Sequence, residues 1–128
     1  MASRDKKDLE AVLVDAYNTT SDRYKQLYPN APQPLISCTY RSNDEQNKLF
    51  EIGRTLPGKK VTNAKAGESK HNTYPSKAFD IAFIGLDKKL DWSEILFRKF
   101  AEIICENPLI VWGGSFHSFK DTPHFELK

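Results

Sequence analysis

Residues 69–84 read SKHNTYPSKAFDIAFI, and the order of their polar and apolar side chains predicts a loop followed by a strand. The second half, KAFDIAFI at 77–84, is short and apolar, which is typical of a buried β-strand. Asp80 departs from this pattern, because a carboxylate is costly to bury without a partner. Taken alone, Asp80 fits an exposed face of the strand or an aspartate that accepts backbone hydrogen bonds. His71, taken alone, fits a solvated loop histidine.

Helix and strand patterns lie on both sides of this segment. Apolar residues recur at helical spacing within residues 5–28, and the clearest helix covers 92–107. Another helix begins at Ser42 or Asn43, which are favourable N-cap residues. Short apolar and β-branched runs predict strands, at 35–40, 77–84, 109–112 and 123–127. The order αβαβαββ predicts an α+β fold, with helices flanking a small, mainly antiparallel sheet, in a single domain covering residues 1–128.

Residues 61–76 lack periodicity and form a long predicted loop around His71. A loop of this length inside a compact domain is usually functional or disordered. We therefore treat it as the first candidate for a functional segment.

The composition limits the possible function classes. A net charge of +2 without a run of like charge argues against nucleic-acid binding, which needs a concentrated basic face. The N-terminus has no apolar core of signal-peptide length, and no stretch approaches a membrane span. We expect a protein made in the cytoplasm without a signal peptide, not inserted in a membrane and monomeric. Cys38 and Cys105 lack CxxC spacing and are predicted to be buried free thiols.

The C-terminal segment DTPHFELK, residues 121–128, adds further candidate site residues. Pro123 lies between Asp121 and His124 and argues against a helix, so this unit is predicted to be a turn that leads into an edge strand. His117 is interpreted as a surface residue, with a metal ligand or substrate contact as the alternative. Glu126 lies two residues after His124 on the same strand face, and either orients His124 or is solvated.

Two imidazoles and a carboxylate, from His71, His124 and Asp80, suffice as ligands of a catalytic zinc and leave a fourth position open. Asp121 then remains available as a general base. His124 also fits a satisfied core histidine. On the residues alone, a metal site and a set of unrelated polar residues both remain open.

Three longer motifs resemble a known family: CTYRSNDEQNKLFEIGRT (38–55), VTNAKAGESKHNTYPSKAFDI (61–81) and VWGGSFHSFKDTPHFEL (111–127). The chain is similar, over about residues 35–127, to zinc D-alanyl-D-alanine carboxypeptidases and L-alanyl-D-glutamate endopeptidases with a hedgehog-type fold, a family that includes many phage endolysins. The resemblance implies one zinc ion per chain and peptidoglycan as the substrate.

The same resemblance implies roles for individual residues. It assigns zinc binding to His71, Asp80 and His124, and the role of catalytic base to Asp121. It implies that Arg41 helps to bind substrate or to stabilise the oxyanion. The spacing from His71 to Asp80 is longer than the usual family spacing, as in a variant associated with phage members.

Two further departures concern neighbouring positions. Ser76 replaces a glycine of the usual motif, and Phe116 stands where a tryptophan is common. The Phe116 difference bears on the substrate cleft and not on the metal.

The expected activity is hydrolysis of a peptide bond in peptidoglycan stem peptides. The preferred candidate is the L-Ala–D-Glu bond, cut by an endolysin-like enzyme, and the alternative is the D-Ala–D-Ala bond. The alternative to an enzyme is a non-catalytic, zinc-containing module that binds the cell wall. Asp121 argues against that module, since a purely structural metal site has no use for an acid that is not a ligand.

Overall fold

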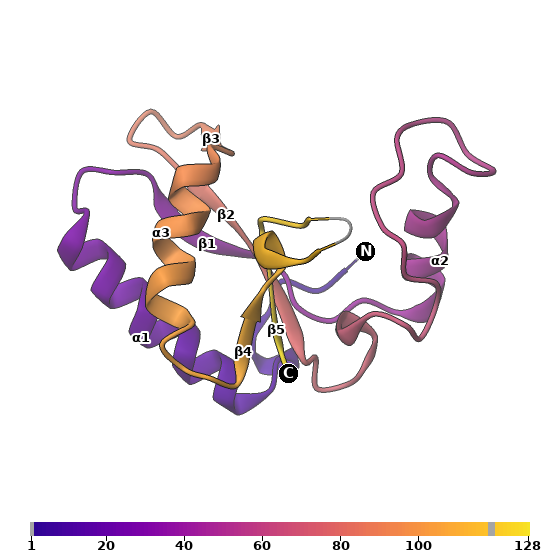
Figure 1. The fold of residues 1–128 in the computed structure, drawn as a ribbon, viewed down its shortest axis with the longest axis horizontal. Coiled ribbons are helices and arrows are strands. Elements are labelled where there is room, and N and C mark those ends of the chain that lie inside the picture. Colours follow the sequence, from indigo (N-terminus) through magenta and orange to yellow (C-terminus); the bar gives the residue numbers. More distant parts are fainter. Residues whose placement is uncertain (1, 118–119) are drawn as a thin grey trace.

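The computed structural model describes residues 2–117 and 120–128, and its elements follow the predicted order (Figure 1). The helices in these residues are α1 (Ala11–Leu27), α2 (Asn43–Glu51) and α3 (Glu94–Ile104). The strands are β1 (Gln33–Cys38), β2 (Ala78–Ile84), β3 (Leu90–Asp91), β4 (Ile110–Trp112) and β5 (His124–Leu127). Short 3₁₀ turns follow the same numbering, as η1 (Lys6–Asp8), η2 (Lys70–Asn72) and η3 (Gly113–Ser115).

Helix α1 begins later than its apolar spacing predicts. Leu9 is buried and extended, and it forms an isolated bridge with Ser76, while the Glu10 N–H donates to the Ser76 carbonyl at 2.9 Å. These contacts satisfy the backbone before the helix begins. Helix α3 is likewise shorter than the predicted 92–107, since Trp92 and Ser93 precede it.

The strands form one antiparallel sheet in the order β1-β2-β5-β4, with the two-residue β3 paired to β2. The α+β prediction with a small antiparallel sheet is therefore confirmed. The prediction that the last strand is an edge strand is wrong, because β5 lies between β2 and β4. Strand β3 is too short to leave a period-two pattern in the sequence, so it was not predicted.

One face of the sheet packs against α1 and α3, which lie on the same side of it (Figure 1). Alternate residues of β2, namely Phe79, Ile81 and Phe83, are fully buried on this face. The rings of Phe79 and Phe125 stack at 5.5 Å, and Phe125 also contacts Phe100 of α3. The intervening residues of β2 and β5 therefore point to the opposite face.

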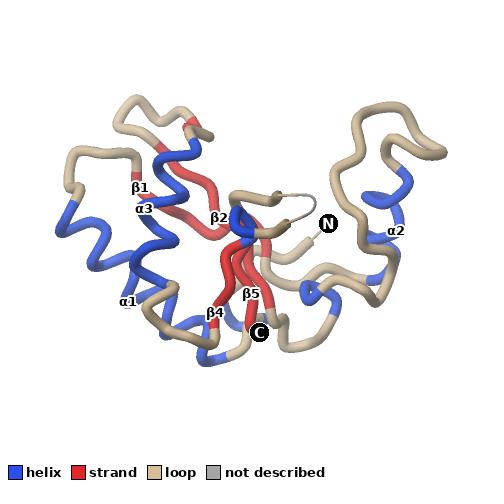
Figure 2. The backbone as a smooth tube through the Cα atoms, in the orientation of Figure 1, coloured by secondary structure: helices blue, strands red, loops and turns tan. Residues whose placement is uncertain are grey.

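An arm made of residues 43–69 extends beside the sheet, away from α1 and α3 (Figure 2). Ser42 caps α2, because its hydroxyl accepts from the Glu45 N–H and the Glu45 carboxylate accepts from the Ser42 N–H. The fully buried Gln46 donates to the Ala64 carbonyl at 2.7 Å and ties the returning chain to the helix. The long loop predicted at 61–76 thus begins within the arm.

None of the helices in the described part of the chain combines the length and the apolar character that a membrane crossing would require.

Candidate metal centre

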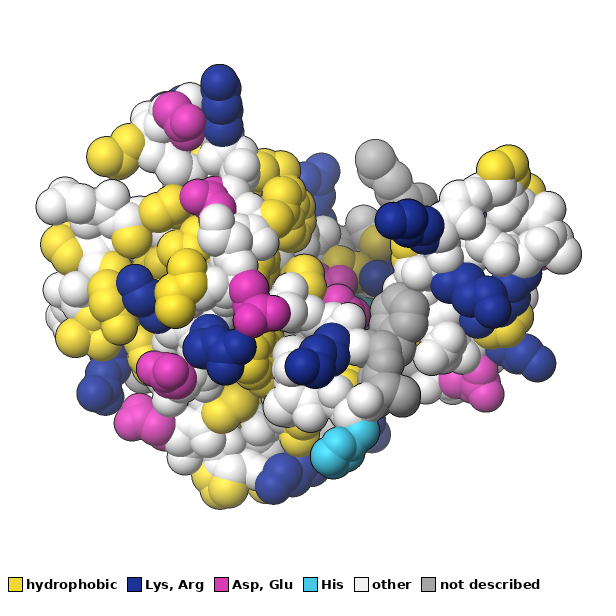
Figure 3. Space-filling view, turned by 45° about the horizontal axis from the view of Figure 1, so that its top comes forward, with side chains coloured by type: hydrophobic (Ala, Val, Ile, Leu, Met, Phe, Trp, Pro, Cys, Tyr) yellow, Lys and Arg dark blue, Asp and Glu magenta, His cyan; other side chains and the backbone are white. Residues whose placement is uncertain are grey.

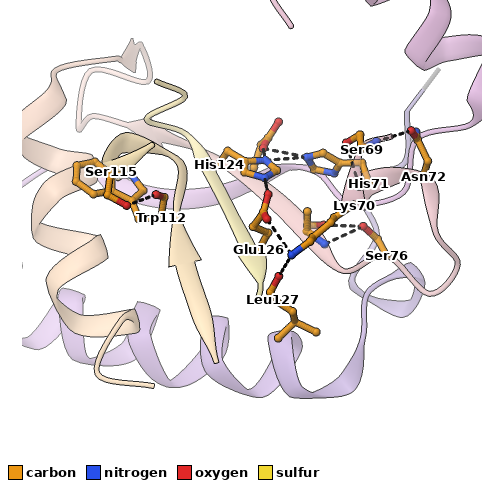
Figure 4. A network of polar contacts seen from close by, with 12 residues as sticks. Ser69, Lys70, His71, Asn72, Ser76, Trp112, Ser115, His124, Glu126 and Leu127 are labelled. Atoms are coloured by element: carbon orange, nitrogen blue, oxygen red, sulfur yellow. Dashed lines mark hydrogen bonds and ion pairs between the residues drawn. The ribbon is translucent and has the colours of Figure 1, made fainter. Parts of the chain in front are cut away.

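The candidate site lies on the sheet face that the helices leave uncovered. Cys38 of β1 pairs with Asp80 of β2, and Asp80 pairs with His124 of β5, so these residues form a row across three strands. His71 reaches the row from η2, whose N-cap is Ser69. The rings of His71 and His124 point toward one another (Figure 4). His71 and His124, which are 53 positions apart in the chain, thus meet at one place.

Three ligand atoms form a nearly equilateral triangle. Nε2 of His71 lies 3.1 Å from Oδ1 of Asp80 and 3.2 Å from Nδ1 of His124. Nδ1 of His124 lies 3.0 Å from the same Asp80 oxygen. Ligands of a tetrahedral zinc ion, with bonds of about 2.0–2.1 Å, lie roughly 3.3 Å apart. The triangle therefore matches the spacing of three zinc ligands to within a few tenths of an ångström.

Hydrogen bonds on the outer side of each imidazole fix which nitrogen faces the triangle. Nδ1 of His71 lies 2.6 Å from the carbonyl oxygen of Thr39, which can only accept, so this nitrogen carries the proton. Nε2 of His124 lies 2.7 Å from Oε1 of Glu126 and donates to that carboxylate in the same way. Both rings then direct a lone pair at Asp80. Three electron-rich atoms at this separation repel one another unless a cation lies between them, so the donor set fits a metal ion.

The electrostatics favour positive charge at the same point. Burial lowers the pKa of the His71 imidazole, but the Asp80 carboxylate outweighs burial and raises that pKa to about 10. Burial also opposes protonation of His124, yet hydrogen bonds to Asp80 and Glu126 raise its pKa to about 9. Burial raises the pKa of Asp80, but the two imidazoles hold it well below its usual range. The carboxylates of Asp80 and Glu126 therefore favour positive charge between the two imidazoles.

Asp121 lies beside the triangle, and one of its oxygens is within 4.8 Å of the ligand atoms of Asp80 and His124. The predicted turn places it there: the Asp121 N–H donates to the Gly113 carbonyl at 3.0 Å, and the His124 N–H donates to the Asp121 carbonyl at 3.1 Å. Burial, followed by the negative charge of Asp80, raises the pKa of the Asp121 carboxyl. Asp121 is thus a partly desolvated acid next to the triangle.

Gly113 is required for this turn because the two chain segments approach closely. A Cβ atom at position 113 would lie 2.2 Å from the Asp121 carbonyl oxygen and 3.0 Å from Cβ of His124. The approach is too close for any side chain.

Arg41 follows β1, and its guanidinium is held inside the site. Nη1 donates to Oε1 of Gln46 at 2.9 Å, and Nη2 lies 3.7 Å from Oδ2 of Asp80, the oxygen outside the triangle. The side chain is only 14% exposed. The guanidinium is therefore largely shielded from solvent.

A cleft of about 480 Å³ opens above these groups. The arm forms one wall, through residues 61–64, and Phe116 and Asp121 form the other. Figure 3 shows the surface hollowed between the arm and the larger body. Residues of both the predicted loop and the C-terminal segment line the cleft.

The remaining sequence predictions have mixed outcomes. His117 is exposed, as predicted. Cys38 is a buried free thiol, also as predicted, whereas Cys105 is exposed because it lies just after the end of α3, so its predicted burial is wrong. Sγ of Cys38 lies 3.7 Å from Nδ1 of His71 and within 4.8 Å of an Asp80 oxygen, so Cys38 is a neighbour of the site. Nδ1 of His71 already donates to the Thr39 carbonyl, so that nitrogen is not free to bind a metal together with the thiol.

Two neighbours of the site, Lys70 and Thr39, were not singled out from the sequence. Thr39 acts through its backbone carbonyl, which no side-chain pattern reveals. The only signal for Lys70 is its position next to His71.

Comparison with known proteins shows one matching family model, described as D-alanyl-D-alanine carboxypeptidase, over residues 62–127. The peptidoglycan L-alanyl-D-glutamate endopeptidase CwlK of Bacillus subtilis is 34% identical over an alignment of 105 residues, and the match covers 73% of this chain and 59% of that protein. The chain therefore spans about three fifths of the length of this curated relative.

Two solved structures share the fold. The L-Ala D-Glu endopeptidase ChiX of Serratia marcescens superposes with a TM-score of 0.70 at 19% identity, covering 100% of this chain and 89% of that one. A mutant of the vancomycin resistance D,D-pentapeptidase VanY, in complex with Zn(II), has a TM-score of 0.64 at 12% identity and covers 93% and 72%, respectively. At these identities the likeness describes the fold alone.

Proposed function

This chain belongs to the D-alanyl-D-alanine carboxypeptidase family, and we propose that it is a zinc peptidase that hydrolyses a peptide bond in the stem peptides of bacterial peptidoglycan. The observation that carries the proposal is the triangle of His71 Nε2, Asp80 Oδ1 and His124 Nδ1, with sides of 3.0–3.2 Å. Asp121 beside it supplies an acid that is suited to proton transfer.

In this proposal His71, Asp80 and His124 hold one zinc ion per chain. The bound ion lowers the pKa of water toward neutrality and polarises the substrate carbonyl. The protein contributes the geometry: Thr39 and Glu126 hold the two imidazoles in the tautomers that leave the ligand nitrogens unprotonated.

Asp121 is proposed as the general base. It accepts a proton from the attacking water and later delivers that proton to the amine of the leaving group. Its raised pKa, caused by burial and by Asp80, moves the carboxylate toward the basicity that this transfer requires.

Arg41 is proposed to stabilise the negative charge that develops on the substrate oxygen. Gln46 and Asp80 hold the guanidinium from two sides, so its orientation is set before the substrate binds. A guanidinium that is already oriented loses less conformational freedom when the reaction proceeds.

Positive charge on one segment of the arm, residues 54–65, supports an anionic substrate. Residues 54–65 contain four exposed cations and no acidic residue, and these cations are Arg54, Lys59, Lys60 and Lys65. Lys and Arg side chains gather on this part of the surface (Figure 3). Stem peptides carry free carboxylates, so residues 54–65 favour their approach to the cleft.

We place the L-Ala–D-Glu bond first among the candidate bonds. CwlK, at 34% identity, is named for that cleavage. The D-Ala–D-Ala bond is the second candidate, because the matching family model is described as D-alanyl-D-alanine carboxypeptidase.

Mass spectrometry of purified peptidoglycan after digestion distinguishes the candidates. Cleavage of L-Ala–D-Glu leaves peptides with D-Glu at the new N-terminus, whereas carboxypeptidase action releases free D-alanine. A protein that carries zinc and binds the polymer but releases neither product would instead be the non-catalytic module.

We further propose that the chain acts on the cell wall as a monomer in an endolysin-like role, which rests on the resemblance of residues 61–81 to the phage variant of the motif. Lysis of wall-exposed bacteria by the externally added protein tests this role. Size-exclusion chromatography with light scattering tests the oligomeric state.

A further inference from the structure

We propose that Glu126, held by Lys70, is a positioning residue that keeps Nδ1 of His124 directed at the metal. The inference rests on the proposed function, because it concerns how the same site is kept ready to bind zinc. Neither residue lies in the triangle, so each acts through His124.

Glu126 is placed by the regular geometry of β5. It follows His124 by two residues, so both side chains project from the same face of the strand. Its Oε1 accepts from His124 Nε2 at 2.7 Å, a short contact typical of a charge-assisted hydrogen bond. Ala78 of β2 lies opposite Glu126 in the pairing of β2 with β5.

Lys70 fixes the other oxygen of Glu126. Its Nζ lies 3.0 Å from Oε2 and also donates to the Leu127 carbonyl (Figure 4). Both carboxylate oxygens are thus engaged, one by His124 and one by Lys70, which leaves Glu126 a single orientation. The Glu126 side chain is 19% exposed, so this pair is better shielded from water than an ordinary surface ion pair.

The pair also joins the two elements that carry the proposed imidazole ligands. Lys70 lies next to His71 in η2, and Glu126 lies near His124 in β5. Backbone hydrogen bonds connect the same elements: Leu127 N–H donates to the Lys77 carbonyl at 3.0 Å, and Lys77 N–H donates to the Lys70 carbonyl at 3.1 Å. The side-chain bridge closes this ring of contacts. Its loss frees the His124 ring to rotate or to place a proton on Nδ1.

The test measures zinc affinity by chelator competition and identifies the coordinating nitrogen of His124 by long-range ¹H–¹⁵N NMR of the zinc-loaded protein. We expect Glu126→Ala to weaken zinc binding by about 10- to 100-fold, as for other partners of metal-bound histidines. In this variant, NMR should show a mixture of coordination by Nδ1 and by Nε2 of His124. Glu126→Gln should retain most of the affinity, since its amide oxygen accepts the same hydrogen bond, and Lys70→Met should fall between the two.

Matched controls separate positioning from a general effect on folding. Lys77→Met changes an exposed lysine directly before β2. Glu102→Ala removes an exposed glutamate of α3, which packs on the other face of the sheet from the site. Both should bind zinc as the wild type does, and thermal unfolding should show every variant folded. If Glu126→Ala is poorly folded, Glu126→Gln and Lys70→Met carry the test by the same measurements.

The outcomes are distinguishable. Wild-type protein that binds no zinc would overturn the proposed function and this inference with it. The positioning role alone would be overturned by a different result. In that result the wild-type protein binds zinc, and the folded Glu126→Ala and Lys70→Met variants bind it with equal affinity and with unchanged coordination by His124.

Discussion

The close approach of Gly113 to the Asp121 turn allows the proposed base to be displaced without removing it. Gly113→Ala places a Cβ atom 2.2 Å from the Asp121 carbonyl oxygen, whereas ordinary contacts begin near 3.4 Å. The turn must therefore move by about 1 Å, and His124 is pushed as well because its Cβ lies 3.0 Å from the new atom. A misplacement of this size costs roughly 100-fold in rate when it separates a catalytic group from its substrate.

The assay combines turnover, zinc content and stability. We expect release of soluble peptides from purified peptidoglycan to slow by about 100-fold in Gly113→Ala. Overpacking should lower the free energy of unfolding in urea by about 1–3 kcal/mol. The three proposed ligands remain in the sequence, so zinc should still bind, although less tightly.

Gly85→Ala is the matched control for this substitution. Its new Cβ lies 2.9 Å from Oδ1 of the exposed Asp87, the far end of a flexible side chain, and 3.7 Å from the Lys89 carbonyl oxygen, which is an ordinary contact. It should leave both turnover and zinc content unchanged. Wild-type turnover in a Gly113→Ala protein that is destabilised as expected would refute the placement of Asp121 in the mechanism. Unchanged stability would refute the steric argument itself.

Four other predictions concern single groups. Elemental analysis should find about one zinc per chain and a large loss of zinc in His124→Ala; full occupancy in that variant would remove His124 from the ligand set. Asp121→Asn should keep its zinc while peptidoglycan turnover falls by about 10²- to 10⁴-fold, and loss of zinc instead would make Asp121 a ligand. Arg41→Lys should not restore activity, because an ammonium cannot reproduce the planar guanidinium; turnover should fall by roughly 100-fold with zinc content unchanged, and wild-type turnover would contradict the oxyanion role. Phe79→Ala removes a fully buried ring that stacks on Phe125, so urea unfolding should show a loss of about 3–5 kcal/mol, and a loss well below 1 kcal/mol would contradict the packing.

The segment 77–84 shows how far local pattern carries the fold. Its apolar run predicts a strand, and β2 covers Ala78–Ile84 as expected. The same run contains Asp80, whose partners the pattern alone does not identify. In the sheet, Phe79 and Ile81 face the helices and Asp80 faces the opposite side, where two imidazoles neutralise it. Alternation along one strand therefore accounts for both the core and the site.

The position of β5 required the tertiary structure. The turn before His124 follows from Pro123, which is a local restriction on the backbone. Whether the next strand lies at the edge or between two others depends on pairing with β2 and β4, and the sequence-based expectation of an edge strand was wrong. The central position allows Asp80 and His124 to face each other across adjacent strands.

The α+β class, the main helices and strands, and the residues proposed for the metal could be predicted from the amino-acid sequence, because periodicity, capping and family motifs are local features of the chain. The tertiary structure was needed to show that His71 and His124, 53 positions apart, present Nε2 and Nδ1 to one oxygen of Asp80. It also decided that Thr39 and Glu126 set those tautomers and that Lys70 holds Glu126 in place. These features depend on strand register and on contacts distant in sequence, where a shift of one residue turns every side chain of a strand to the other face.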